Sequence, residues 1–180
     1  IPQPMAFSVQ DLDYITALGP ASLSEGPIAE LEQAWQACLK GRTDQPDGVR
    51  LIIWDSWLRS VRAGLDPDDG QYRFVDPEVL AATLAANRML ITAAAEVMRG
   101  LLAYNPRGHI NLTDAKGTTL YFCGLDLTPV GSRLLESVQG TNCTGLALAQ
   151  DRLMYVLAEE NFGVGLRRRR MHCAAAPIRD

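Results

Sequence analysis

The chain has 180 residues, of which 47% are hydrophobic and 21% are charged, so it can bury one well-formed core with an additional segment. Its net charge of -4 and its pI near 5.2 argue against a general nucleic-acid-binding surface, and no direct nucleic acid contact is expected. No apolar run of about 18 residues occurs, and the start IPQPMAF lacks the features of a signal peptide. A cytoplasmic protein without a membrane span is therefore expected.

The four cysteines, Cys38, Cys123, Cys143 and Cys173, are widely spaced and include no C-x-x-C pair. This spacing fits neither a disulfide scaffold nor a zinc knuckle, so reduced and mostly buried thiols are expected. His172 and Cys173 are adjacent, but neighbours on a strand point to opposite faces, which makes joint metal binding awkward. We expect no metal and no cofactor.

Two amphipathic helices are predicted in the first third of the chain. Ser24 and Pro27 mark the start of the first helix, Gly41 marks its end, and apolar residues recur between them at helical spacing. The second helix runs through VRLIIWDSWLRSVRAG, where Gly64 can adopt the left-handed conformation that ends many helices. The turn-rich segment LDPDDGQYRF then predicts a linker with a boundary near residue 75, which makes residues 1–75 a helical N-terminal extension.

A long helix is predicted from Asp76, a good N-cap residue, to about Tyr104. Its residues include the 4-3-4-3-4-3 spacing of a coiled-coil seam, which comprises Leu80, Leu84, Asn87, Ile91, Ala94, Met98 and Leu101. A second stripe beside this seam comprises Val79, Leu90 and Val97. The two stripes predict a homodimer through residues 76–104, with Asn87 fixing the register. A single wide face buried within one subunit is the alternative.

The remaining residues predict strands around a short helix. HINLTD and TTLYFC form a hairpin about the turn 115–117, LMYVLA is a buried strand, and MHCAAAPIRD is a strand of small residues. GTNCTGLALA starts a short helix that Asn142 can cap, and an aspartate at this position should retain the cap. The alanines of the last strand face this helix and leave either closely packed backbones or a cavity, as in a small-molecule receptor.

Five segments resemble, in chain order, the sensory region of bacterial enhancer-binding transcription activators of the acetoin- and dihydroxyacetone-operon regulator type: DSWLRSVRAGLDPDDG, INLTDAKGTTLYF, GTNCTGLALAQDR, AEENF and CAAAPIRD. The resemblance implies an α+β fold in residues 76–180, a GAF-like antiparallel sheet of six strands flanked by helices, with an effector pocket on one face. In that family the sensor precedes an ATPase domain acting on the sigma-54 polymerase and a DNA-binding helix-turn-helix. Neither output domain has a motif in this chain, and the last strands of the GAF sheet are also expected to be missing.

The resemblance implies a ligand-sensing regulatory domain that binds a small organic effector, and not an enzyme. Cys143 is the candidate nucleophile, because a thiol at a helix N-terminus ionises more easily and His172 could take its proton. The family usually has a small or apolar residue at this position, so Cys143 is expected to pack and no catalytic residue is expected. A cysteine-dependent enzyme using Cys143 and His172 is one alternative, and a dimerisation module with an empty pocket is another.

The effector pocket is expected between the second hairpin strand, the helix after Asn142, the loop before the arginines and the alanine strand. Its predicted residues are Tyr121, Cys123, Leu135, Asn142, Leu146, Tyr155, Phe162, His172 and Ala174. The run Arg167 to Arg170 is expected to be a solvated loop, although it could meet an anionic ligand or the downstream ATPase. A ketone, a diol, a short acid or an aromatic compound would all be compatible effectors.

Overall fold

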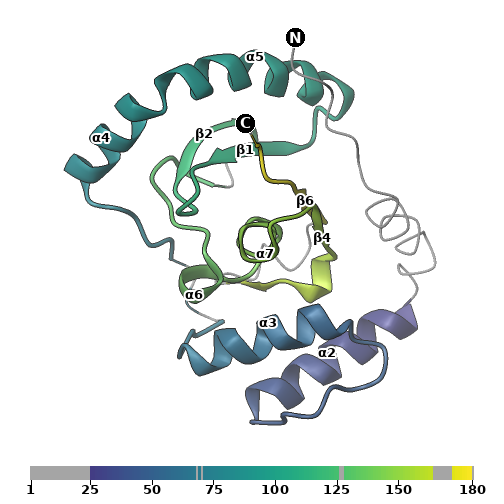
Figure 1. Cartoon of the computed structure of the whole chain (residues 1–180). Helices are drawn as coiled ribbons and strands as arrows, with labels where there is room; N and C mark the ends of the chain where they lie inside the picture. The colour runs from purple at the N-terminus through teal and green to yellow at the C-terminus, as the bar shows by residue number, and fades with distance from the viewer. Residues whose placement is uncertain (1–24, 68, 70, 126–127, 164–171, 180) are drawn as a thin grey trace.

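The structure is a computed structural model that describes residues 25–67, 69, 71–125, 128–163 and 172–179, and its fold is α+β. Figure 1 shows the helices α4 and α5 on one side of the molecule, a β-hairpin beneath them, the short helix α7 at the centre, and the helices α2 and α3 on the opposite side. The α+β class predicted from the sequence is therefore confirmed.

The two N-terminal helices form as predicted, with α2 at Glu25–Leu39 and α3 at Leu51–Arg62. The end of α3 shows why Gly64 is needed there. Gly64 has a φ of 71°, its N–H donates to the Val61 carbonyl (2.9 Å), and the N–H of Leu65 donates to the Ser60 carbonyl (3.2 Å). These two bonds satisfy carbonyls that the last helical turn leaves without partners.

The core of the molecule joins α2 and α3 to residues from the C-terminal half. Trp54 and Trp57 of α3 are almost fully buried and pack edge to face, with ring centroids 6.1 Å apart. The same hydrophobic cluster includes Cys143, Leu146 and Ala147 of α7 (Cys143–Gln150), together with Met154 and Val156. The boundary predicted near residue 75 therefore does not separate two cores, because the N-terminal helices bury their apolar faces against α7.

The long helix predicted between residues 76 and 104 is wrong as a single element. The structure has two helices, α4 at Pro77–Ala86 and α5 at Arg88–Tyr104, bent by 76° at Asn87. The Asn87 side-chain amide donates to the Thr83 carbonyl (2.9 Å), and Asn87 itself has φ -100° and ψ 11°. An asparagine side chain that bonds a nearby carbonyl competes with the helical backbone, which explains the break. No single described helix is long and apolar enough to cross a bilayer.

The hairpin forms as predicted and packs under α5. The strand β1 (His109–Thr113) pairs antiparallel with β2 (Thr119–Gly124), and Met98 of α5 is buried against Leu112 and Leu120 of these strands. Three members of the predicted seam, Leu84, Ile91 and Ala94, pack against the same cluster. Most of the seam is thus occupied within the chain, which fits the alternative of a face buried within one subunit.

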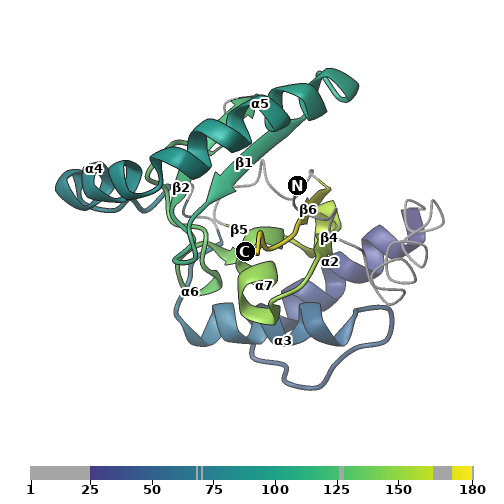
Figure 2. The same cartoon turned by 45° about the horizontal axis from the view of Figure 1, so that its top comes forward.

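Two further strand pairs surround α7 (Figure 2). The strand β4 (Met154–Val156) pairs antiparallel with the alanine strand β6 (Cys173–Ala175), which confirms both predicted strands, and α7 lies against them. A shorter pair joins β3 (Gly140–Thr141) to β5 (Phe162–Gly163). Two short helical turns, α6 at Glu136–Gln139 and η2 at Ala158–Glu160, complete the fold.

The described strands form three separate two-stranded pairs and not the single six-stranded sheet that the resemblance implies. The outer edge of β2 meets the segment around Ser132 instead of a further strand, and Thr119 exchanges backbone hydrogen bonds with Gly131 and Ser132 (2.8 and 2.9 Å). Pro129 cannot donate to a ladder, and Gly131 has a φ of 87°, so this segment cannot continue as a regular strand.

Candidate functional site

A cavity of about 430 Å³ lies at the N-terminus of α7, between the start of β1 and the alanine strand β6. Its volume is in the range of pockets that hold small organic molecules. The lining comes from five parts of the chain: the loop before β1, the strand β1, the segment 125–134, the first turn of α7, and the residues around β5 and β6. The lining residues are Asn105, Arg107, Gly108, His109, Asn111, Leu125, Thr128, Leu134, Asn142, Cys143, Thr144, Asn161, His172, Cys173 and Ala174.

Asn142 fixes the position of α7 at this cavity. Its side-chain oxygen accepts the Gly145 N–H (2.9 Å), which is the predicted N-cap bond, and its amide nitrogen donates to the Leu134 and Gly140 carbonyls (both 2.9 Å). The two donations were not foreseen. An aspartate could still accept the Gly145 N–H, but it would lose both donations, because a carboxylate cannot donate to a carbonyl. Asn142 is therefore a structural cap whose hydrogen-bonding groups are largely occupied.

The small residues of α7 let the helix lie close to the chain before it, as predicted. A side chain at Gly145 would bring its Cβ to 2.9 Å from the Leu134 carbonyl and from the Glu136 N–H. Both atoms belong to the backbone, which cannot move aside easily. The glycine therefore permits a close approach that any larger residue would prevent.

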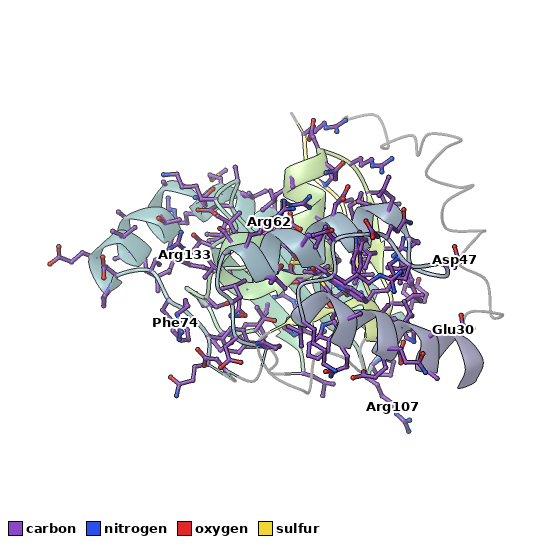
Figure 3. The ribbon with its side chains drawn as sticks, turned by 90° about the horizontal axis from the view of Figure 1, so that it is seen from below. Glu30, Asp47, Arg62, Phe74, Arg107 and Arg133 are labelled. Carbon is purple, nitrogen blue, oxygen red and sulfur yellow. The ribbon has the colours of Figure 1, made fainter. Side chains whose placement is uncertain are left out.

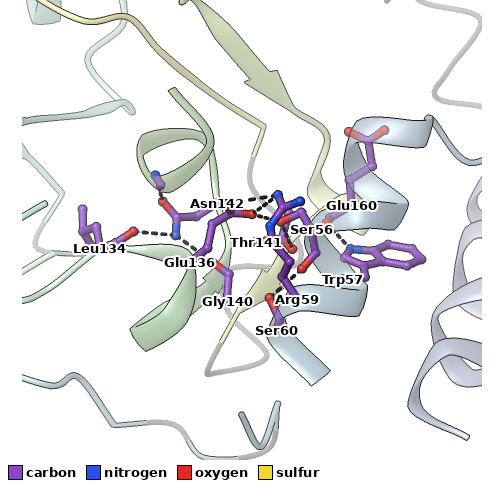
Figure 4. Close-up of polar contacts among 11 residues, drawn as sticks. Ser56, Trp57, Arg59, Ser60, Leu134, Glu136, Gly140, Thr141, Asn142 and Glu160 are labelled. Atoms are coloured by element: carbon purple, nitrogen blue, oxygen red, sulfur yellow. Dashed lines mark hydrogen bonds and ion pairs between the residues drawn. The ribbon is translucent and has the colours of Figure 1, made fainter. Parts of the chain in front are cut away.

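Behind the cavity, a polar cluster joins α3 to α6 and β3 (Figure 4). The buried Ser56 hydroxyl donates to the Glu136 carboxylate and lies 2.6 Å from the Thr141 hydroxyl. Arg59 donates to both oxygens of the Glu136 carboxylate (3.0 and 3.2 Å), and the Ser60 hydroxyl donates to the Ser56 carbonyl (2.9 Å). The segments S-W-x-R-S (residues 56–60) and G-T-N (residues 140–142), which are parts of the family resemblance, thus contact each other. Most of the residues in this cluster hold the fold together.

A second buried connection joins the start of α3 to η2. Arg50 donates to the Glu160 carboxylate, with 2.7 Å between Nε and Oε1, and the Leu157 N–H donates to the same carboxylate (2.8 Å). The indole N–H of Trp57 donates to the Glu160 carbonyl (2.8 Å). A buried carboxylate is stable only when it is paired in this way, so this part of the fold is fixed by its ion pair.

Cys143 is buried and lines the cavity, but its environment does not favour a thiolate. Its hydrogen bond with the Cys173 thiol and its burial raise the pKa of Cys143 well above the ordinary value. A nucleophilic cysteine needs the opposite shift. Cys173 in turn donates to the side-chain oxygen of Asn161 (3.9 Å).

The described residues of the cavity lining include polar groups but no carboxylate. The Nδ1 of His109 donates to the Leu125 carbonyl (2.5 Å), and the exposed His172 ring stacks on Tyr155, with 6.4 Å between their centroids. The side chain of Arg107 is exposed and extends away from the body of the molecule (Figure 3). Among the described residues, no three His, Cys, Asp or Glu side chains lie together in a geometry that could hold a metal ion.

The structure places three of the nine predicted ligand residues at this cavity, namely Asn142, His172 and Ala174. Tyr121 and Cys123 lie on the other face of the hairpin, where they pack toward α5, so the prediction had the wrong face of that strand. Leu146 is fully buried in the core under α7.

The other predicted residues have different surroundings. Leu135 lines a separate depression next to Arg59 and Gly145. Tyr155 lies on β4 and contacts the cavity only indirectly, through its stacking on His172. Phe162 pairs with Thr141 in β5, but its side chain is outside the described part of the structure, as is the whole run Arg167 to Arg170.

The sequence prediction missed the group of residues on the β1 side, which includes Asn105, His109, Asn111 and Asn161. The alternation of the first strand contained a signal for two of them. Ile110 and Leu112 alternate with His109 and Asn111 in HINLTD, so His109 and Asn111 point to the opposite face of the strand. Asn161 had no comparable signal, because its position depends on how η2 packs.

No protein-family model matches the chain, and no solved structure matches it. The chain is 31% identical, over 165 residues, to a Rhodococcus erythropolis protein described as "Uncharacterized 47.3 kDa protein in thcA 5'region". The similarity covers 78% of this chain and 34% of that protein, so the chain spans about a third of the length of this curated relative. The relative's name carries no statement about activity, ligand or partner.

Proposed function

We propose that this chain is a GAF-like sensor module of a bacterial sigma-54-dependent transcription activator, which binds a small organic effector at the N-terminus of α7. The observation that carries the proposal is the cavity of about 430 Å³, whose lining combines asparagine, threonine and histidine side chains with apolar leucines. A few fixed polar groups in an otherwise apolar pocket are typical of sites that orient a small molecule.

The environment of the Cys143 thiol supports binding of a ligand without chemical conversion. Cys143 and His172 line the same cavity, as the two residues of a cysteine-dependent enzyme would have to do. However, the raised pKa of Cys143 keeps its thiol protonated near neutral pH. The thiol partner of Cys143 is Cys173, which cannot act as a general base in the way that a histidine can. The proposal therefore assigns no catalytic residue to this chain.

The position of α7 suggests how binding would be transmitted. Its first turn lines the cavity, whereas Leu146 and Ala147 are buried against the tryptophan cluster of α3. A ligand that shifts α7 would therefore change the packing of α3. In the proposal the module is cytoplasmic and homodimeric, and its signal passes to ATPase and DNA-binding domains outside this chain.

The experiment is a thermal-shift screen of catabolic metabolites against the chain, followed by calorimetry with each hit. A ligand at 100 times its dissociation constant should add roughly 2.7 kcal/mol to the free energy of unfolding. Ala174→Leu, which adds bulk at the cavity wall, should abolish the shift. Ala149→Leu is the matched control, since Ala149 is exposed at the far end of α7. A hit that Ala174→Leu leaves unchanged, or a hit that the chain converts chemically, would contradict the proposal.

A further inference from the structure

The outer face of α5 carries a stripe of exposed apolar residues. Met89, Val97, Leu101 and Tyr104 are large side chains that are 79%, 62%, 55% and 91% exposed. Ala93 and Gly100 lie between them and are also exposed. Figure 2 shows α5 along the edge of the molecule, with the hairpin on one side of it only. This stripe, residues 89, 93, 97, 100, 101 and 104, has no partner among the described residues.

The stripe and the buried face lie on opposite sides of the helix. At 100° per residue, Met89, Ala93, Gly100 and Tyr104 fall within about 60° of one another. The buried Ala95 and Met98 fall on roughly the reverse side. A helix that is apolar on both sides normally has both sides covered, so the outer stripe requires an occupant.

Four stripe residues are placed symmetrically about the centre of α5. Met89, Ala93, Gly100 and Tyr104, with Glu96 and Val97 at the centre, are separated by 4, 3, 1, 3 and 4 positions, and each half runs from a large outer residue to a small one. If a second α5 lies antiparallel, with a two-fold axis between Glu96 and Val97, then Met89 faces the partner's Tyr104. Ala93 then faces the partner's Gly100. Such a self-complementary surface is what an isologous contact between identical chains needs.

The charges of α5 fit the same arrangement. A two-fold axis of this kind places the same side of both helices next to each other. The side of α5 that carries Glu96 and Arg99 therefore lies beside the same side of the partner's α5. Glu96 then lies about two residues, or about 3 Å along the axis, from the partner's Arg99. Glu96 and Arg99 are both exposed, although Arg99 also donates to the Tyr121 hydroxyl (3.3 Å). The opposite edge brings Val97 close to its own copy, since the two lie about one residue, or about 1.5 Å, apart along the axis.

Gly100 supports close contact between two helices. A glycine inside a helix costs stability, and no described residue lies within 4 Å of the position that its Cβ would take. The described part of the chain therefore gives no packing reason for a glycine at this position. Opposite the partner's Ala93, it would let the two helix backbones approach.

A lipid surface is the other occupant that an apolar stripe could have. Helices that lie on anionic membranes have an excess of Lys and Arg on the polar face. Residues 77–104 contain Glu78, Glu96, Arg88 and Arg99 as their charged residues, so their net charge is zero. The charge balance therefore favours a protein partner.

We propose that the outer stripe of α5 is the homodimer surface of this chain, formed by antiparallel pairing of two α5 helices about an axis between Glu96 and Val97. The seam residues Leu84, Ile91, Ala94 and Met98 pack toward the hairpin, whereas Leu101 belongs to the outer stripe. The inference is independent of the ligand cavity.

Sedimentation velocity over a concentration series tests the surface by charge reversal. Glu96→Arg and Arg99→Glu should each raise the dimer dissociation constant by about fivefold or more, because two pairs become repulsive at once. The double variant, with both reversals, should restore dimerisation. Val97→Glu at the centre of the contact should weaken the dimer by about tenfold or more. At a concentration where every protein is monomeric, all four variants should keep the unfolding midpoint of the original chain, since these side chains are exposed.

Cross-linking tests the position of the axis. In Val97→Cys, the two introduced thiols should form an intermolecular disulfide rapidly, whereas Leu51→Cys, on the exposed surface of α3, and the original chain should not. Co-sedimentation with anionic lipid vesicles tests the other occupant. The proposal is overturned if the chain is monomeric at every concentration, if the charge reversals and Val97→Glu have no effect, or if Val97→Glu abolishes vesicle binding by a monomer.

Discussion

Cys143, on the first turn of α7, is hydrogen-bonded through its thiol to the thiol of Cys173, on the alanine strand β6. The two residues are 30 positions apart in the sequence. Their contact joins the helix and the strand that form one wall of the cavity. The contact also affects the character of Cys143, because the Cys173 thiol and burial both raise the pKa of Cys143.

The first prediction concerns the reactivity of this thiol. Because the Cys173 thiol and burial raise the pKa of Cys143, a thiol-specific reagent should modify it slowly at neutral pH, and far more slowly than in the chain unfolded by denaturant. Peptide mass spectrometry after timed quenching would measure the rate for each cysteine. Rapid and stoichiometric modification of Cys143 near pH 6 would show a lowered pKa, and would favour the cysteine-dependent enzyme.

The second prediction concerns the dependence of stability on pH. Burial raises the pKa of Cys38 above its ordinary value of 9.0. The Cys173 thiol and burial raise the pKa of Cys143 above the same ordinary value. Above that value the unfolded chain loses these protons while the folded chain keeps them, so the free energy of unfolding falls as pH rises. The slope is about 1.4 kcal/mol per pH unit for each thiol at most. Below pH 9 this contribution is fully present.

Urea denaturation at pH values on both sides of 9 would measure that slope. In Cys143→Ala one of the two thiols is absent, so stability should fall less steeply with rising pH, whatever its value at pH 7. Equal slopes in the two proteins would mean that Cys143 ionises as easily in the folded chain as in the unfolded chain.

The sequence predicted local structure well where one residue type has one physical role. The glycine at 64 ends α3, Asn142 caps α7, and the glycine and alanines of α7 permit close packing, all as expected from the local sequence. Each of these roles depends on a backbone conformation or on a hydrogen bond within a few residues. Such features do not depend on which distant segments come together.

The sequence predictions that failed were those that depend on contacts between distant segments. An asparagine in a heptad seam can fix a coiled-coil register or bend the helix, and the spacing around Asn87 is the same in both cases. The faces of β2 depend on which side α5 covers, and the pattern of that strand does not distinguish its two sides. The sequence also did not predict that α2 and α3 share one hydrophobic cluster with α7. The pattern of an amphipathic helix shows that the helix packs on something, but not which element it packs against.

The third prediction separates the two roles of Asn142. Asn142→Ala should cost about 2 to 4 kcal/mol of unfolding free energy, since the cap bond and two bonds to carbonyls are lost together. Asn142→Asp keeps the cap acceptor but places a carboxylate against the Leu134 and Gly140 carbonyls, so it should also destabilise. Chemical denaturation would measure both. An aspartate variant as stable as the original chain would show that the two donated bonds contribute little.

The fourth prediction concerns Gln139, whose side chain is 1% exposed. Neither atom of its amide has a hydrogen-bond partner among the described residues. Gln139→Met has a similar shape and removes the cost of burying these polar atoms, so it should stabilise the chain by about 1 to 3 kcal/mol. Gln36→Met, at an exposed position of α2, is the control and should change stability by less than about 0.5 kcal/mol. Destabilisation by Gln139→Met would indicate that the amide is bonded to an ordered water molecule.

The last prediction concerns the cluster around Ser56, which joins the two motifs of the family resemblance. Ser56→Ala removes a buried hydroxyl that donates to Glu136 and contacts Thr141, and it should cost about 1 to 3 kcal/mol of unfolding free energy. Ser137→Ala is the control, because Ser137 is exposed on α6. If the cluster is structural, effector affinity measured well below the unfolding temperature should stay within a few-fold of the original value. A large loss of affinity with unchanged stability would instead place the effector at this cluster, and the cavity at α7 would not be the binding site.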